Sequence, residues 1–369
     1  MKFTCQRQDI VSAINMASKA VSPKPQTPIL SGIFLKAEEG KLEVQATDYE
    51  IGIIYDIPAE IDIPGTIVLP GRYLQEVVRR LPEERVLFLL DEKNRIVHIR
   101  SGNANYTLRS MNAGDYPGVK RIEGTLSFTI PDTVLRSLLR KTVFACATDD
   151  SRPIFTGVNF DFDGKTLTLA GTNTHRLAVK TKTFDDEIGK LKLIVPGKTL
   201  QELLRTFTSD VPTDVAVTCS MNQISFQYEN LYFTSRLIEG AFPSFANVIP
   251  KSTVTTVTMT TADLSAAMDR VFLISRTNDY NVMKLHFGAS NLHISSSNPD
   301  IGMADEDIPA TIAGPDIDIA FNATYLVDAL KVLEGETCTF ALTKPLAPVL
   351  ITEPDDPEFQ YVVTPMRTH

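Results

Sequence analysis

Apolar residues recur every three or four positions in six segments of the chain, and this spacing is typical of amphipathic helices. In one of these segments, Leu264, Met268, Val271 and Phe272 fall on one side of a 3.6-residue helical repeat. The pattern predicts helices over residues 8–21, 71–81, 132–146, 198–207, 262–274 and 324–333.

Apolar and polar residues alternate strictly in several short segments between these helices. Residues 42–45 read Leu-Glu-Val-Gln and residues 167–169 read Leu-Thr-Leu, and Gly40 and Gly164 precede them. A period of two predicts strands, and the glycines predict tight turns. Many short strands with few helices favour an α+β fold, in which helices cover one side of a mostly antiparallel sheet.

The same order of elements occurs three times along the chain. Leu42, Leu167 and Leu292 are spaced by 125 residues, and Pro70-Gly71 matches Pro196-Gly197 at an offset of 126. Self-similarity at a constant period indicates repeated structural units. We therefore predict three domains of one fold, each with two helices on antiparallel sheet, over residues 1–124, 125–251 and 252–369.

The charge of the chain is unevenly distributed. The net charge is −9 and the pI about 5.2, which taken alone argues against a nucleic-acid partner. The six predicted helices carry +4, so the other segments must carry −13. Arg72 and Arg79 share the helix face opposite the apolar stripe, as do Arg136 and Arg140. These residues form either ordinary solvated helix faces or a basic surface for phosphates, with acidic segments repelling DNA elsewhere.

No segment has the pattern of an export signal or a membrane span. The N-terminal residues lack an apolar stretch, and the longest apolar runs, such as 86–90, are far too short for a bilayer. The four cysteines, at positions 5, 146, 219 and 338, are too far apart for a CxxC pair or a zinc ligand set. We expect a cytoplasmic protein with reduced, mostly buried thiols.

The sequence offers little catalytic chemistry. Gly197-Lys198-Thr199 matches only the end of a phosphate-binding P-loop, because Lys192 stands where that motif requires its first glycine. Dinucleotide-binding, metalloprotease and serine-hydrolase motifs are absent from the sequence. His175 is the best catalytic candidate, although a hydrogen-bonded structural histidine is the simpler interpretation.

Three features together resemble the family of bacterial beta sliding clamps, the beta subunits of DNA polymerase III. They are the threefold layout, residues 172–177 (Thr-Asn-Thr-His-Arg-Leu) and residues 361–367 (Tyr-Val-Val-Thr-Pro-Met-Arg). The resemblance covers essentially the whole chain. It implies a head-to-tail homodimer whose six similar domains form a ring with helices lining the central hole. It also implies that the protein has no cofactor and is not an enzyme.

The resemblance further implies a function and a set of partners. A clamp of this family encircles double-stranded DNA without reading its sequence, and it confers processivity on the replicative DNA polymerase. A separate ATP-driven clamp loader opens the ring. The polymerase alpha subunit, other polymerases and repair proteins bind through short, mostly apolar peptide motifs, and no membrane is involved.

Functional residues are implied in three groups. For the peptide-binding pocket they are Phe155, Thr172, Thr174, His175, Arg176, Leu177, Pro243, Asn247, Val248, Tyr280, Asn322, Tyr325, Leu346, Pro348, Val362, Val363, Pro365, Met366 and Arg367. For DNA the resemblance points to Lys24, Arg152 and Lys198, and the helical charge pattern adds Arg72, Arg79 and Arg136. For the dimer interface it places Tyr106 and Leu108 against Leu273 and Ile274.

Two pocket positions depart from the family pattern. Thr174 stands where the family commonly has glycine, and Asn247 stands where it often has a basic residue. The branched side chain of Thr174 is expected to narrow the mouth of the pocket. A glycine there should therefore leave peptide binding unchanged or strengthen it.

Other functions stay open on the residues alone. An enzyme built from repeats would need a convergent set of acids and bases, which the sequence does not reveal. A sequence-specific DNA binder would need side chains that reach base edges. A peptide-binding scaffold with no DNA role fits the acidic pI, and retention on circular DNA would separate it from a clamp.

Overall fold

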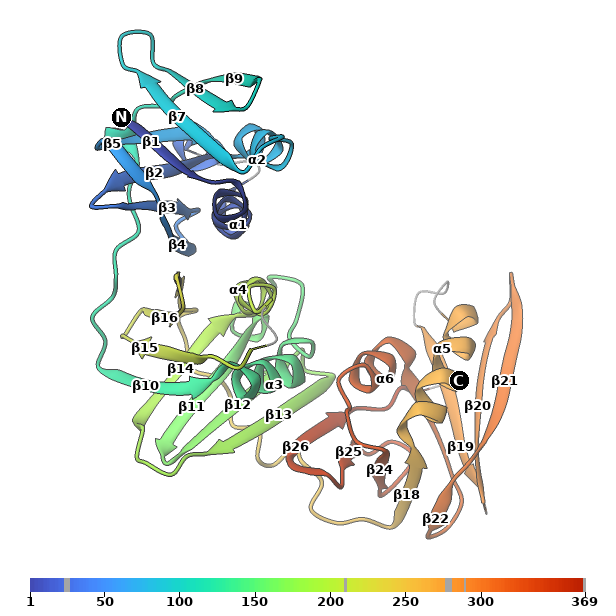
Figure 1. Ribbon diagram of the computed structural model, residues 1–369. Helices are drawn as coiled ribbons and strands as arrows, with labels where there is room; N and C mark the ends of the chain where they lie inside the picture. The colour runs from blue at the N-terminus through green and yellow to red at the C-terminus, as the bar shows by residue number, and fades with distance from the viewer. Residues whose placement is uncertain (23–26, 209–210, 276–280, 289, 368–369) are drawn as a thin grey trace. The chain divides into compact units, whose positions relative to one another are not determined.

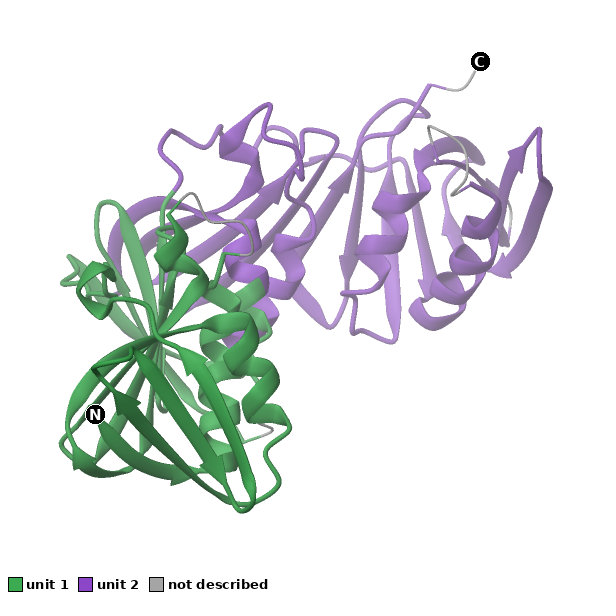
Figure 2. Ribbon diagram, turned by 90° about the horizontal axis from the view of Figure 1, so that it is seen from above, with its two compact units in different colours: residues 1–133, 202–237 green, residues 134–201, 238–369 purple. Residues whose placement is uncertain are grey.

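The computed structural model describes residues 1–22, 27–208, 211–275, 281–288 and 290–367. These residues form two compact units (Figure 2). Unit 1 contains residues 1–133 and 202–237, and unit 2 contains residues 134–201 and 238–369. Within the described ranges, no helix is both long and apolar enough to cross a membrane.

The order of helices and strands repeats three times along the chain (Figure 1). The first repeat contains β1 (Lys2–Gln6), α1 (Arg7–Ala17), β2 (Gly32–Glu38), β3 (Lys41–Thr47), β4 (Ile51–Pro58), β5 (Glu60–Ile63), β6 (Gly65–Pro70), α2 (Gly71–Arg79), β7 (Arg85–Asp91), β8 (Ile96–Ser101) and β9 (Ala104–Arg109). The second contains β10 (Leu126–Pro131), α3 (Asp132–Val143), β11 (Gly157–Gly164), β12 (Thr166–Thr172), β13 (Arg176–Thr183), β14 (Gly189–Pro196), α4 (Gly197–Leu204), β15 (Asp214–Cys219), β16 (Gln223–Tyr228) and β17 (Leu231–Arg236). The third contains β18 (Thr255–Thr260), α5 (Thr261–Ser275), β19 (Val282–Gly288), β20 (Asn291–Asn298), β21 (Gly302–Pro309), β22 (Thr311–Ala313), β23 (Ile317–Asn322), α6 (Ala323–Leu330), β24 (Thr337–Leu342), β25 (Val349–Glu353) and β26 (Asp356–Val363).

All six predicted helices are confirmed, but several end earlier than the apolar pattern suggests. The α-helix predicted to reach residue 21 ends at Ala17, where the Ser18 hydroxyl donates to the carbonyl of Ile14 at 2.6 Å and a 3-10 turn follows. The helix predicted to reach residue 146 ends at Val143, after the Thr142 hydroxyl has bonded the Leu138 carbonyl at 2.7 Å. Hydroxyl groups that bond the preceding turn compete with the helical pattern.

Over the described ranges, the strands form four antiparallel sheets, two in each unit. Unit 1 holds a sheet of order β5-β1-β7-β8-β9 and a sheet of order β10-β15-β16-β17-β4-β3-β2-β6. Unit 2 holds a sheet of order β14-β11-β12-β13-β26-β25-β24-β18-β22 and a sheet of order β21-β20-β19-β23. Two of these sheets therefore cross from one repeat to the next, through the pairs β4–β17 and β13–β26.

One face of each sheet is covered by helices. In unit 1, α1 packs against β4 and against α2, and in unit 2, α5 packs against β20, β21 and α6 (Figure 1). Leu264, Met268 and Val271 on α5 are buried in the core of unit 2, as the apolar spacing predicts. Burial of each such side chain contributes about 1.5–3 kcal/mol to folding.

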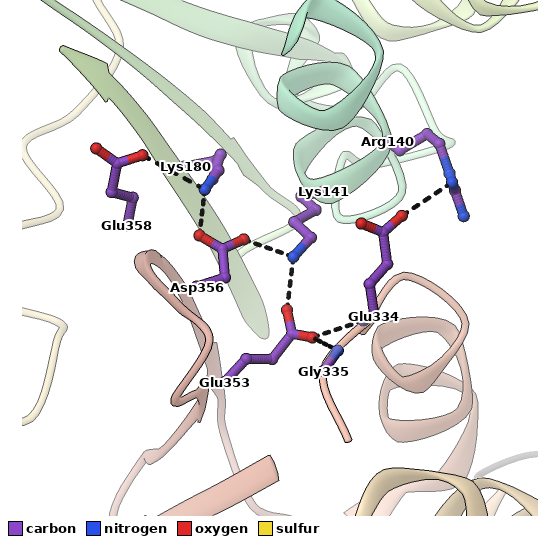
Figure 3. A network of polar contacts seen from close by, with 8 residues as sticks. All are labelled: Arg140, Lys141, Lys180, Glu334, Gly335, Glu353, Asp356 and Glu358. Carbon is purple, nitrogen blue, oxygen red and sulfur yellow. Dashed lines mark hydrogen bonds and ion pairs between the residues drawn. The ribbon is translucent and has the colours of Figure 1, made fainter. Parts of the chain in front are cut away.

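A buried network of charges ties α3 to the strands of the third repeat inside unit 2 (Figure 3). The Lys141 ammonium lies 2.5 Å from Glu353 and 2.6 Å from Asp356, and its side chain is only 3% exposed. Asp356 also pairs with Lys180, and Glu353 accepts the backbone N–H of Gly335 at 2.5 Å. Every charge in this network thus has an opposite charge beside it, which a buried ion requires.

The hydrogen bonds of this network shift its pKa values against the effect of burial. Burial alone would lower the pKa of Lys141, but hydrogen bonds to Asp356 and Glu353 raise it above the ordinary value. Burial alone would raise the pKa of Asp356, but hydrogen bonds from Lys141 and Lys180 hold it below the ordinary value.

All four cysteines are buried, and none of them forms a disulfide. Burial raises the pKa of Cys5, Cys146 and Cys219 to about 12 and that of Cys338 to about 11. Within the described part of the chain, no group of three or more His, Cys, Asp or Glu side chains could hold a metal ion.

Candidate functional site

A tight loop between β12 and β13 forms one wall of a cavity in unit 2. The Asn173 side-chain oxygen accepts the backbone N–H groups of His175 and Arg176, both at 3.1 Å. The Thr172 hydroxyl donates to the Arg176 carbonyl at 2.6 Å and accepts the N–H of Thr174 at 3.1 Å. These bonds hold Thr174 at φ 77°, a left-handed conformation that is rare for a β-branched residue.

The cavity beside this loop has a volume of about 190 Å³ and a largely apolar wall. Its floor is the cluster of Leu177 and Val362, and Phe242 packs edge-on against Phe155 with ring centroids 6.0 Å apart. Val248 on the rim is 46% exposed. The cavity is lined by Phe155, Thr172, Thr174, His175, Arg176, Leu177, Phe242, Pro243, Ser244, Phe245, Val248, Val362 and Thr364.

Arg176 is held rigidly beneath the polar side of the cavity. Its guanidinium lies 2.8 Å from the Asp328 carboxylate, stacks 4.8 Å above the ring of Tyr325 and donates to the carbonyl of Phe144. The ring of His175 also stacks on Tyr325, at a centroid distance of 6.4 Å. Such contacts fix the direction of the polar groups before a ligand arrives, which lowers the entropy cost of binding.

Two further cavities of unit 2 contain predicted pocket residues. One, of about 650 Å³, shares Phe155, Thr174, His175 and Arg176 with the first cavity and adds Tyr325. The other, also of about 650 Å³, is lined in part by Leu346, Met366 and Arg367.

The remaining predicted pocket residues are placed differently. Val363 is fully buried in the core of unit 2, because side chains alternate along β26 and Val362 takes the side facing the cavity. Asn322 caps α6 by accepting the N–H of Thr324 at 3.0 Å. Asn247 is exposed next to Val248, and Pro348 and Pro365 are half-buried. Tyr280 lies outside the described residues.

The cavity also contains four residues that the sequence analysis did not assign to it, namely Phe242, Ser244, Phe245 and Thr364. Three of them lie in the run Phe242-Pro243-Ser244-Phe245, where two aromatic residues flank a proline outside any strand. Partly exposed aromatic residues in a loop between two strands are a general signal of binding, but this signal does not say which cavity they line.

The chemistry of this site suits binding. Aliphatic and aromatic walls with a few fixed polar groups accept an apolar anchor side chain. His175 contacts the Tyr325 ring, and no hydrogen bond joins its imidazole to a carboxylate in the part of the chain that the structure describes.

The predicted DNA-contacting cations lie on or beside helices. Arg72 and Arg79 are exposed on α2, Lys198 is exposed on α4, and Arg152 is exposed in the loop after α3. Arg136 on α3 is half-buried. Lys24 lies outside the described residues.

The predicted interface residues lie on two elements. Tyr106 and Leu108 are half-buried on β9, the last strand of its sheet. Leu273 on α5 is 67% exposed, and Ile274 beside it is half-buried.

Comparisons with known proteins relate the whole chain to one family. Residues 1–120 match the N-terminal domain of the DNA polymerase III beta subunit, residues 129–244 its central domain and residues 246–367 its C-terminal domain. The chain is 35% identical over 380 residues to the beta sliding clamp of Bacillus subtilis, with 100% of each chain covered.

Solved structures of sliding clamps have the same fold. The chain superposes on the DNA polymerase sliding clamp from Bacillus subtilis with a TM-score of 0.95 at 34% identity. It superposes on the sliding clamp from Pseudomonas aeruginosa bound to griselimycin with a TM-score of 0.93 at 29% identity. In both comparisons 100% of each chain is covered.

Proposed function

The chain belongs to the DNA polymerase III beta subunit family, the beta sliding clamps, and from this we propose that two copies form a ring around duplex DNA. The ring tethers the replicative polymerase to its template and acts in the cytoplasm. We propose no catalytic step and no cofactor for it.

The observation that carries the proposal is the way in which successive repeats join. β4 of the first repeat pairs with β17, the last strand of the second, and β13 of the second pairs with β26, the last strand of the third. The last strand of the first repeat, β9, lies at the edge of its sheet. In the third repeat, β21 corresponds to β4 and β13, and it also lies at the edge of its sheet. A second copy supplies the missing neighbour to each, so that two chains close head to tail.

Charge favours the same pairing. β21 exposes Asp305 and Asp307, whereas Arg100 on β8 and Arg109 at the end of β9 are exposed cations. Opposite charges at two edges that meet fix their register and exclude pairing of like edges. The pair of Leu273 and Ile274 on α5, which packs against β21, supplies the apolar part of the interface.

DNA is held by enclosure rather than by tight contact. The exposed cations Arg72, Arg79, Arg152 and Lys198, together with Lys24 and Arg136, give modest attraction to phosphates. Attraction of this kind falls steeply with salt, whereas a closed ring stays on a circular molecule.

We place the docking of polymerases and repair proteins at the 190 Å³ cavity of unit 2. An apolar anchor side chain of a short peptide would contact Leu177, Val248 and Val362, and His175 would orient the backbone. Burial of one such anchor contributes about 1.5–3 kcal/mol, so micromolar binding, which needs about 8 kcal/mol, requires several such contacts from one peptide.

Retention on DNA of different topology tests the function. The protein is loaded onto nicked circular DNA with a bacterial clamp loader and ATP, washed at high salt and then treated with a restriction enzyme. We expect the protein to stay on circles and to leave after linearisation. Equal retention on circular and linear DNA would overturn the ring.

A further inference from the structure

Unit 1 contains a cavity that occupies the same place in the repeat as the cavity of unit 2. It lies where β4 of the first repeat meets β17 of the second, and its volume is about 220 Å³. The cavity is lined by Thr47, Tyr49, Glu50, Ile51, Gly52, Gly118, Val119, Lys120, Gln223, Thr234 and Arg236. Residues 47–52 precede residues 172–177 by the repeat spacing of 125.

The loops that wall the two cavities are held by the same hydrogen bonds. The Asp48 carboxylate accepts the N–H groups of Glu50 at 3.0 Å and Ile51 at 2.8 Å, as the Asn173 amide does in the loop of unit 2. The Thr47 hydroxyl donates to the Ile51 carbonyl at 2.7 Å and accepts the N–H of Tyr49 at 3.1 Å. Tyr49 has φ 75° and Thr174 has φ 77°.

The neighbouring strand from the next repeat, β17 or β26, is bonded to each loop in the same way. The N–H of Arg236 donates to the Glu50 carbonyl at 2.9 Å, and the N–H of Thr364 donates to the His175 carbonyl at 2.9 Å. The same loop, with one residue in the left-handed region, therefore occurs twice, at corresponding positions where successive repeats pair. Because left-handed backbone costs energy for tyrosine and threonine, a well-bonded loop is needed to hold it at both places.

The linings of the two cavities differ in kind. Gly52 stands where the other cavity has Leu177, and a Cβ atom added there would lie 2.8 Å from side-chain atoms of Val119 and Thr234. These side chains therefore close the deep apolar space that Leu177 borders in unit 2. Tyr49, in contrast, is 48% exposed at the rim.

The lining of the cavity in unit 1 mixes polar and apolar residues, and it carries more positive than negative charge. Lys120, Arg236 and Glu50 are all exposed at its rim. None of the three forms an ion pair with a residue that the structure describes. Two cations that have no ion-pair partner among the described residues, beside an exposed tyrosine, attract a carboxylate and leave an aromatic face for the chain that bears it.

We propose that this cavity is a second peptide-binding site, and that it takes a short extended segment with acidic side chains. A carboxylate of the segment is held by Lys120 and Arg236, and its backbone lies across Tyr49 and the shallow surface over Gly52. The apolar motif expected in unit 2 does not fit here, because the deep apolar space is closed. The two sites can therefore hold different parts of partners at the same time.

Fluorescence of a single introduced tryptophan tests the proposal. The chain has no tryptophan, so Tyr49→Trp creates one reporter in unit 1, and Thr174→Trp creates its counterpart in unit 2. The probe is an acetylated, amidated hexapeptide, Ser-Asp-Glu-Ala-Asp-Val. We expect a saturable fluorescence change in Tyr49→Trp and none in Thr174→Trp.

Charge reversal shows whether the carboxylates carry the binding. In the Tyr49→Trp protein, Lys120→Glu or Arg236→Glu should weaken binding about ten-fold, the loss expected for one charge-assisted hydrogen bond. Lys93→Glu, which makes the same charge change on an exposed residue of the β7–β8 turn, should leave binding unchanged. Circular dichroism checks that each variant is folded.

Calorimetry with the unsubstituted protein is the second measurement, since a tryptophan can alter the site. It should give the same affinity as the fluorescence titration. The proposal is overturned if neither method detects binding at about 1 mM peptide. It is also overturned if a peptide with Asn and Gln in place of Asp and Glu binds equally well. Either result would leave the proposed ring intact, because retention on circular DNA is measured in a separate experiment.

Discussion

Thr174 departs from the family pattern at a position where the backbone itself favours glycine. The resemblance implies a glycine at this position, and the sequence suggests only that a threonine would crowd the pocket. The structure gives a stronger reason, because Thr174 has φ 77°, where a side chain is strained and glycine is not.

Thr174→Gly should therefore raise the free energy of unfolding by about 1 kcal/mol. Urea denaturation followed by circular dichroism measures this change. Thr256→Gly is the matched control, since Thr256 lies in the extended strand β18 and glycine there should cost about 0.5–1 kcal/mol. Destabilisation by both substitutions would show that the loop does not strain Thr174.

Val248 offers a direct test of the cavity in unit 2, because it lines the cavity and is 46% exposed. Val248→Asp should weaken a peptide with leucine and phenylalanine anchors at least about ten-fold, since a charge replaces apolar contact. Val254→Asp alters a valine that is 54% exposed in the same unit but does not line that cavity, and it should bind normally. Binding is measured by calorimetry. Equal affinity in the two variants would show that the peptide binds at another site.

At the scale of the elements, helices were predictable from sequence and strand pairing was not. The 3.6-residue spacing located all six helices, because a helix is stabilised by contacts that are local in sequence. The pairing of β4 with β17 joins residues 176 to 184 positions apart, and alternation within a strand says nothing about its neighbour. Phe242 and Phe245 were missed for the same reason, since their place in the cavity depends on distant strands.

The packing of α3 against the third repeat depends on the buried charge network. Lys141→Met would leave Glu353 and Asp356 without their shared cation and should cost about 3–5 kcal/mol of folding free energy. Arg140→Met removes the neighbouring pair with Glu334, whose partners are 52% and 60% exposed, and should cost under about 1 kcal/mol. Urea denaturation of both variants measures the contrast, and similar losses would mean that the network adds little.

The network should also make stability depend on pH at both extremes. Because the pKa of Asp356 is lower in the folded chain, its contribution is present above its ordinary value near 3.8 and is lost as pH falls through the folded value. Because the pKa of Lys141 is raised, its contribution is present below about 10.5 and is lost as pH rises further. The difference in free energy of unfolding between wild type and Lys141→Met should therefore become smaller below about pH 4. A difference that stayed constant from about pH 7 to pH 3 would contradict this.

At the scale of the whole molecule, the repeat explains why two chains should associate. Replacement of Leu273 by Ala together with Ile274 by Asp should yield monomers, because a buried carboxylate lies where an apolar contact is expected. Met221→Asp alters an apolar side chain that is 83% exposed in unit 1 and should leave the dimer intact. Light scattering at micromolar concentration is the measurement. A wild-type protein that ran as a monomer there would count against the proposed ring.

The four buried cysteines have a practical consequence for observing such a ring. A thiol must ionise to react with a maleimide, and these thiols are both shielded from solvent and held at pKa values of about 11 to 12. A single cysteine placed on the surface would therefore be the only rapidly reactive one, without removal of any native residue. Fluorescent dyes could then be attached at chosen positions, so that opening and closing of one ring on one DNA molecule could be followed by energy transfer.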